Sequence, residues 1–70
     1  MTAGDIERDL KRYCKGASFI TPGELSKYLG EKNTSRVRNR FMTDAFRIEG
    51  TNKYFIPEIA TKIYQTGATS

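Results

Sequence analysis

The sequence lacks histidine and tryptophan, and it has a single cysteine. Without histidine the usual general base is missing, and Cys14 has no imidazole to activate it and no second cysteine to form a disulfide with. Zinc sites of the common spacings need several cysteine or histidine ligands. The glycines stand singly, so no phosphate-cradling motif is present. We therefore expect a protein that is not an enzyme, with no metal site and no cofactor.

Long apolar runs are also missing. No stretch approaches the roughly 20 apolar residues that cross a bilayer, and nothing resembles a signal peptide. These absences predict a cytoplasmic protein, nucleoid-associated if it binds DNA, with no membrane partner. Seventy residues suffice for one domain, which we place at residues 1–65. The small polar residues 66–70 are expected to form a flexible tail.

The positive charge is concentrated in the second half of the chain. Residues 1–31 hold five basic and five acidic side chains, whereas residues 32–70 hold seven basic and three acidic ones, which accounts for the whole net charge of +4. Within residues 32–40 there are four basic residues and no acid. A localised positive surface favours polyanions, because phosphate neutralisation releases counterions. The alternative is a basic helix face that only serves solubility.

Residues 21–42 carry the pattern of two short helices joined by a turn. Thr21 and Glu24 can form a capping box around Pro22, and Gly30 suits the left-handed conformation that ends a helix. Leu25 and Leu29 share one face, with Tyr28 beside them. Asn33 or Thr34 can cap a second helix with Val37 and Phe41 four residues apart. This pattern predicts a helix-turn-helix.

The second of these helices has a polar side suited to DNA. On a helical wheel Val37 and Phe41, with Ala45, mark the inward side. Side chains on or next to the opposite side can reach base edges; they are Ser35, Arg36, Asn39 and Thr43. Flanking and neighbouring basic side chains can reach phosphates; they are Lys32, Arg38, Arg40 and Arg47.

A β-hairpin is predicted for residues 45–57. Phe46 and Ile48 alternate with charged residues, turn-forming residues follow, and a second apolar run ends at Pro57. The predicted tip, Thr51, Asn52 and Lys53, is polar and carries one positive charge, which suits contact with the DNA backbone or minor groove. The alternative is a hairpin that only closes the core.

The remaining segments are predicted to form the scaffold. Residues 18–20 suit a single rung of a sheet. Residues 1–14 and the segment from Pro57 form helices with apolar stripes, and the last helix packs on the first or forms a dimer seam. The stripes are Ile6, Leu10, Tyr13 and Cys14, with a buried free thiol at Cys14, and Ile59, Ile63 and Tyr64.

The order helix, strand, helix, basic helix, hairpin, helix resembles the winged helix-turn-helix family of DNA-binding domains. The likeness covers residues 3–65 and is most specific in ELSKYLG (24–30) and TSRVR (34–38); ITPGELSKYLG and KYFIPEI also resemble the small winged helices of excisionases and MerR-type regulators. The resemblance implies an α+β fold, helix 33–43 in the major groove and a wing at residues 50–53 on the backbone or minor groove. Ser26 departs from the pattern, because the family has a small apolar residue there.

These patterns predict a partner, double-stranded DNA, and leave three modes open. We prefer the first mode, a sequence-specific regulator or excisionase-type factor, because Ser, Asn and Thr stand on the exposed side of the basic helix. A sequence-nonspecific architectural protein and a protein–protein interaction module are the alternatives. Weak homodimers or tandem binding on DNA are compatible with the small predicted interface.

Overall fold

Four α-helices, one π-helical segment and a two-stranded sheet make up residues 2–66, the part of the chain that this computed structural model describes. The predicted α+β class agrees with this content. The elements follow the order α1 (Ala3–Tyr13), β1 (Phe19–Ile20), α2 (Pro22–Leu29), α3 (Thr34–Val37), η1 (Arg38–Met42, the π-helical segment), β2 (Tyr54–Phe55) and α4 (Ile56–Gln65). No helix in the described range is long and apolar enough to cross a membrane.

Side-chain caps fix where the helices begin. The Thr21 hydroxyl accepts a hydrogen bond from the Glu24 backbone N–H at 3.2 Å, and the Glu24 carboxylate accepts one from the Thr21 N–H at 3.0 Å. Thr2 and Asp5 form the same capping box at α1. Gly30 ends α2 with φ of 74°, a conformation that costs glycine little. The capping residues predicted from the sequence are confirmed.

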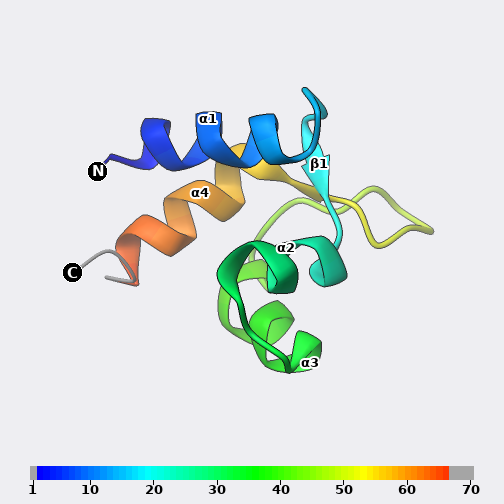
Figure 1. Ribbon diagram of the computed structural model, residues 1–70. Coiled ribbons are helices and arrows are strands. Elements are labelled where there is room, and N and C mark those ends of the chain that lie inside the picture. The colour runs from blue at the N-terminus through cyan, green and yellow to red at the C-terminus, as the bar shows by residue number, and fades with distance from the viewer. Residues whose placement is uncertain (1, 67–70) are drawn as a thin grey trace.

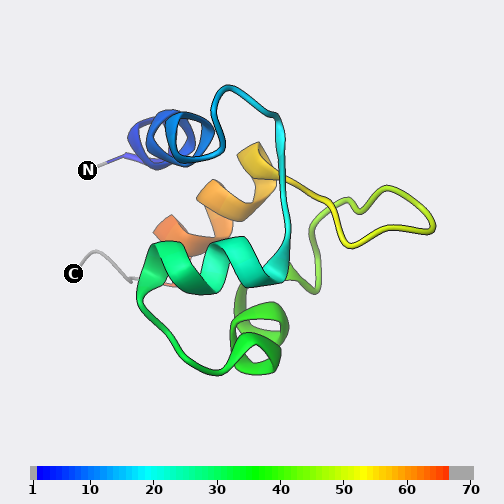
Figure 2. The ribbon, with the colours of Figure 1, turned by 45° about the vertical axis from the view of Figure 1, so that its right-hand side comes forward.

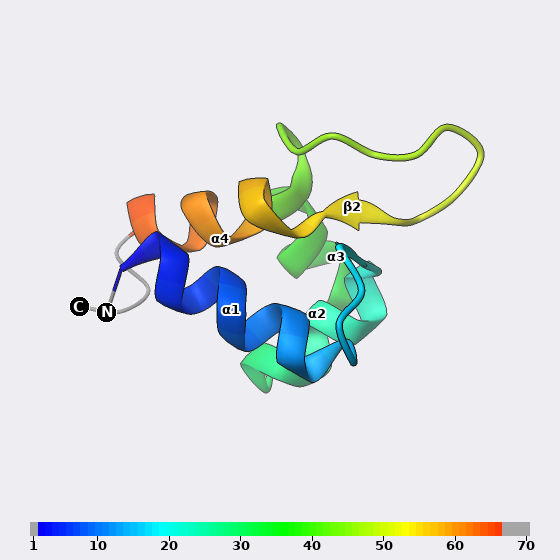
Figure 3. The same ribbon diagram turned by 90° about the horizontal axis from the view of Figure 1, so that it is seen from above.

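Helices α1 and α4 pack against each other and run in opposite directions (Figures 1 and 3). Ile6 and Leu10 of α1 are buried, as are the isoleucines and the alanine of α4. The core continues into β1, α2, α3 and η1; its members are Ile6, Leu10, Ile20, Leu25, Val37, Phe41, Met42, Ile56, Ile59, Ala60 and Ile63. The last helix therefore packs on the first, and its isoleucines are not free to form a dimer seam.

Three residues of the predicted stripes are less buried than expected. Tyr13 and Tyr64 are exposed, and Cys14 is half-buried. The Tyr13 ring instead packs edge-on against Tyr28 at a centroid distance of 5.4 Å. Burial, with a contribution from the nearby Glu24 carboxylate, raises the pKa of the Cys14 thiol. Most of the tail predicted at residues 66–70 lies outside the described residues, and Thr66 caps the end of α4.

The predicted hairpin is wrong in its strand content. β2 pairs antiparallel with β1, with Phe19 opposite Phe55 and Ile20 opposite Tyr54. The segment before the loop contributes an isolated bridge between Arg47 and Tyr54. Two backbone hydrogen bonds flank this bridge, from the Ile48 N–H to the Lys53 carbonyl at 3.0 Å and from the Phe55 N–H to the Phe46 carbonyl at 2.9 Å. Residues 45–49 therefore do not form a regular strand, and the described sheet has two strands.

Residues 46–53 form a loop that projects from the body of the protein (Figures 1 and 2). The Thr51 N–H donates to the Ile48 carbonyl at 3.0 Å, and Gly50 has φ of 80°, which is the geometry of a type II turn. At the base of the loop, the Phe46 N–H donates to the Glu58 carboxylate of α4 at 2.9 Å. The turn thus begins at Ile48, earlier than the Gly50–Asn52 turn predicted from the sequence.

Candidate nucleic-acid interface

The basic segment after the turn is a single rod with a change of winding. Asn33 caps it, since its side-chain Oδ1 accepts a hydrogen bond from the Arg36 N–H at 3.1 Å. Residues 34–37 are α-helical and residues 38–42 are π-helical. The predicted helix at 33–43 is therefore present, but it is not α-helical throughout.

The π-helical winding changes which residues face the core. Its hydrogen bonds join residues five apart, so side chains at this spacing align on one face. Val37 and Met42, five apart, are both buried, at 3% and 0% exposed surface, and Phe41 lies beside them at 7%. Met42 was not predicted to face inward, because a wheel of 100° per residue directs it away from Val37.

The opposite side of the rod carries basic side chains that face solvent. Arg36, Arg38 and Arg40 are all exposed. Within residues 2–66 none of them pairs with a carboxylate, since the two ion pairs there join Lys11 to Glu7 and Lys62 to Asp44. Arg40 lies over the Phe41 ring, 5.4 Å from its centroid. These guanidinium groups can therefore bind an external anion without first breaking an ion pair.

Several of the predicted base-reading residues meet in one shallow depression. Its lining residues are Asn33, Ser35, Arg36, Asn39 and Arg40. Three of the four residues predicted to read bases are among them, together with Arg40, which was predicted to bind phosphate. Asn33 was predicted only as a cap, and no pattern in the sequence indicated that it lines this surface. The depression therefore combines amide, hydroxyl and guanidinium groups.

Three predicted residues in and next to the rod lie outside this depression. Thr43 follows the last turn of η1, is exposed, and directs its hydroxyl to the Asn39 carbonyl at 3.5 Å. Arg38 is exposed on the same rod, and Lys32 is exposed in the preceding turn. The depression therefore spans α3 and the beginning of η1.

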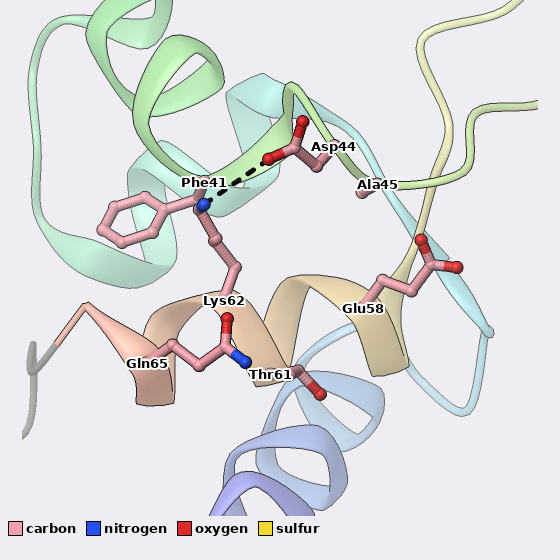
Figure 4. A pocket seen from close by; sticks show the side chains of 7 residues that line it. All are labelled: Phe41, Asp44, Ala45, Glu58, Thr61, Lys62 and Gln65. Atoms are coloured by element: carbon pink, nitrogen blue, oxygen red, sulfur yellow. Dashed lines mark ion pairs between the residues drawn. The ribbon is translucent and has the colours of Figure 1, made fainter.

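The C-terminal end of the rod is joined to α4. Figure 4 shows Lys62 extending from α4 toward Asp44, which follows η1, and the two side chains form an ion pair at 3.5 Å. Phe41, Asp44 and Glu58 line the pocket between the two elements. Because Asp44 is 82% exposed, this ion pair adds little to stability. Burial of Val37, Phe41 and Met42 is what holds the rod in place.

Side chains within the 46–53 loop shape its tip. Arg47 Nη1 donates to the Thr51 carbonyl at 2.8 Å. The Thr51 hydroxyl donates to the Ile48 carbonyl at 2.8 Å and accepts from the Lys53 N–H at 3.2 Å. Arg47 and Thr51 thus brace the loop, a role that the sequence did not predict. Asn52 and Lys53 are exposed at the tip.

Comparisons of the chain with protein-family models, with curated proteins and with solved structures return no match. The residues and their geometry are therefore the basis for the functional assignment.

Proposed function

We propose that this protein binds double-stranded DNA as a winged helix-turn-helix domain. Helices α2 and α3 with η1 form the helix-turn-helix, and residues 46–53 form the wing. The observation that carries the proposal is that Arg36, Arg38 and Arg40 are exposed and pair with no carboxylate within residues 2–66, on a rod whose other side is buried. In this assignment the rod lies in the major groove, and Asn52 and Lys53 contact the backbone or the minor groove.

The proposed mode is sequence-specific. In helix-turn-helix proteins the N-terminal part of the recognition helix contacts base edges. Ser35 and Arg36 occupy that part of the rod, and Asn39 follows in η1. Arg36 can pair with guanine as Asn39 can with adenine. Lys32, Arg38 and Arg40 neutralise phosphates in this mode. Thr43, at the far end of the rod, is assigned the outermost base contact.

Arg47 has a second role in this proposal. Its guanidinium has five N–H donors and uses one of them on the Thr51 carbonyl. The others remain for a phosphate. Arg47 would then fix the wing and contact the backbone at once, so its loss should weaken binding more than the loss of Lys53.

Titration of a short duplex at several salt concentrations tests the proposal. Four to five phosphate contacts predict that log K falls against log salt with a slope of about −4. Arg36→Ala should relax base preference and cost roughly tenfold or more on the preferred site, whereas Lys53→Ala should weaken all sequences alike and reduce the slope by about one. Lys11→Ala, on α1, is the matched control and should leave the affinity unchanged.

The same titration separates the alternatives. Equal losses on preferred and random duplexes from both substitutions would favour a sequence-nonspecific architectural protein. Absence of salt-dependent duplex binding would contradict DNA binding in either mode and would leave the protein–protein module.

A further inference from the structure

A second hollow lies next to the shallow depression, between α2 and the basic rod. Its lining residues are Leu29, Glu31, Arg36, Val37, Arg40 and Phe41. Leu29 is half-buried, Val37 and Phe41 are buried at 3% and 7% exposed surface, and Arg36 and Arg40 supply two positive groups beside these apolar side chains. This surface is a groove of about 280 Å³. We call it the α2–rod groove.

Arg36 and Arg40 line both this groove and the depression proposed to read DNA. They are four residues apart, both are exposed, and neither has a carboxylate partner within residues 2–66. An anion held in the groove would therefore occupy the guanidinium groups that the DNA needs. Binding at the two surfaces must be competitive.

Glu31, the single carboxylate that lines the groove, already accepts backbone hydrogen bonds from the turn between α2 and α3. Its Oε1 accepts hydrogen bonds from the Lys32 N–H at 2.9 Å and from the Asn33 N–H at 3.3 Å. It still contributes a negative charge, so two arginines and one glutamate leave the groove with a net positive charge. Charge complementarity thus favours an acidic occupant.

The shape of the groove favours a peptide over a small molecule. Its volume accommodates one bulky side chain, but its open sides would leave most of a small ligand in water, whereas ligand pockets bury most of their ligand. A peptide can insert one apolar side chain and place flanking carboxylates on the arginines. Bidentate arginine–carboxylate pairs suit this arrangement.

We propose that the α2–rod groove docks an acidic segment of a partner protein, with one bulky apolar side chain between carboxylates, and that this segment displaces DNA. The displacement rests on the proposed function, since it requires that Arg36 and Arg40 bind DNA. The docking itself does not. The partner would act as an antagonist of DNA binding.

Chemical-shift titration with a designed peptide tests the docking. The probe is an acetylated pentapeptide with a central phenylalanine between two pairs of glutamates, and its control has glycine in place of the phenylalanine. The probe should shift the amides of Leu29, Arg36 and Val37 and bind about tenfold more tightly than the control. Equal affinity of both peptides, or shifts confined to other surfaces, would overturn the proposal.

Two variants and one small molecule sharpen the result. Leu29→Ser should reduce probe affinity to that of the glycine control while circular dichroism stays unchanged. Glu31→Gln should tighten probe binding about twofold to threefold, because one repelling charge is removed and the turn keeps its acceptor. If benzoate binds as tightly as the probe, the groove is a site for small organic anions and the peptide proposal fails.

A competition experiment distinguishes this inference from the proposed function. The probe should raise the apparent Kd of a bound duplex, and the glycine control should do so about tenfold less effectively. If a duplex binds the protein and a groove-bound probe does not raise its apparent Kd, displacement alone is refuted. A probe that docks on a protein unable to bind duplex would refute the DNA proposal and leave the docking site intact.

Discussion

The side-chain Oδ1 of Asn33 accepts a hydrogen bond from the Arg36 N–H at 3.1 Å. The residue that caps the basic rod therefore also holds the backbone of Arg36, the arginine proposed to read a base. Asn33 faces the shallow depression as well. Because Asn33 both caps the rod and lines the depression, substitutions can test its effect on stability and its effect on DNA binding separately.

Asn33→Ala should lower the free energy of unfolding by about 1 kcal/mol, because the Arg36 N–H loses its acceptor. Asn33→Asp should leave stability unchanged to within about 0.5 kcal/mol, since aspartate is an equally good N-cap. The added negative charge beside the depression should nevertheless weaken duplex binding by about tenfold. Urea denaturation and duplex titration measure the two effects, and an Asp variant with wild-type duplex affinity would place the DNA elsewhere.

Lys15 is held in a conformation that usually belongs to glycine. It has φ of 58° directly after α1, where the Gly16 N–H donates to the Lys11 carbonyl at 2.7 Å and the Lys15 N–H to the Arg12 carbonyl at 3.1 Å. This is a Schellman motif with lysine at the left-handed position. Lys15→Gly should raise the free energy of unfolding by about 1 kcal/mol, because the Cβ is strained there.

The matched control for Lys15→Gly is Lys15→Ala, which removes the same charge but keeps the Cβ. Urea denaturation of both variants should show the gain only for glycine. An equal gain for alanine would mean that the charge, and not the backbone conformation, is responsible.

Ser26 of α2 is buried, and its hydroxyl has no hydrogen-bond partner within the described residues. A buried hydroxyl without a partner loses its hydrogen bonds to water and makes no hydrogen bond in the folded protein to replace them. Ser26→Ala should therefore stabilise the protein by about 1 kcal/mol. Ser35→Ala on the exposed side of α3 is the comparison and should change stability by less than about 0.5 kcal/mol. A loss of stability in Ser26→Ala would show that the hydroxyl has a partner in solution.

Tyr28 on α2 donates a hydrogen bond to the Asp9 carboxylate on α1. Burial, then the hydrogen bond and charge of Asp9, raise the pKa of Tyr28 to about 12 from the usual 10. Because the folded protein holds the proton more tightly than the unfolded chain, its contribution to stability is complete below pH 10. That contribution declines as the pH rises through 12.

A pH titration of phenolate absorbance measures this effect. One of the four tyrosines should ionise last, and Tyr28→Phe should remove that final step. The variant should also lose less stability than the wild type between pH 10 and 12. If all tyrosines ionise together in the folded protein, the hydrogen bond to Asp9 is absent in solution.

Local chemistry predicted the beginnings and ends of the helices well. Thr21 with Glu24, Asn33 and Gly30 act through neighbours four or fewer residues away, so the sequence alone contains the relevant interactions. The short rung at β1 followed in the same way from the β-branched and aromatic residues there. No long-range contact was needed for these predictions.

The winding of the rod could not be predicted in the same way. A period of 3.6 residues predicts that Val37 and Phe41 face the core. It does not predict that Met42 does, because the π-helical hydrogen bonds depend on tertiary packing. The strand expected at residues 45–49 failed for a related reason. The alternation of Phe46 and Ile48 satisfies a strand pattern, but Phe46 is 58% exposed, and only its carbonyl pairs with β2, through the Phe55 N–H, while its N–H donates to the Glu58 side chain.

Only part of the candidate site could be predicted from the sequence. Arg36 and Asn39 were predicted to lie on the exposed side of the rod, and both line the depression, because side-chain type and helical position suffice for that placement. The bracing of the loop by Arg47 and the shared position of Arg40 in two hollows depend on tertiary arrangement. Neither has a signature in the spacing of residues.

One measurement tests the central proposal most directly, a chemical-shift titration of the protein with a short duplex of mixed sequence. We predict shifts concentrated in residues 32–43 and at Asn52 and Lys53, with α1 unaffected. Shifts confined to α1 and α4, or no shifts at low salt, would contradict the assignment of the basic rod as a DNA-binding surface.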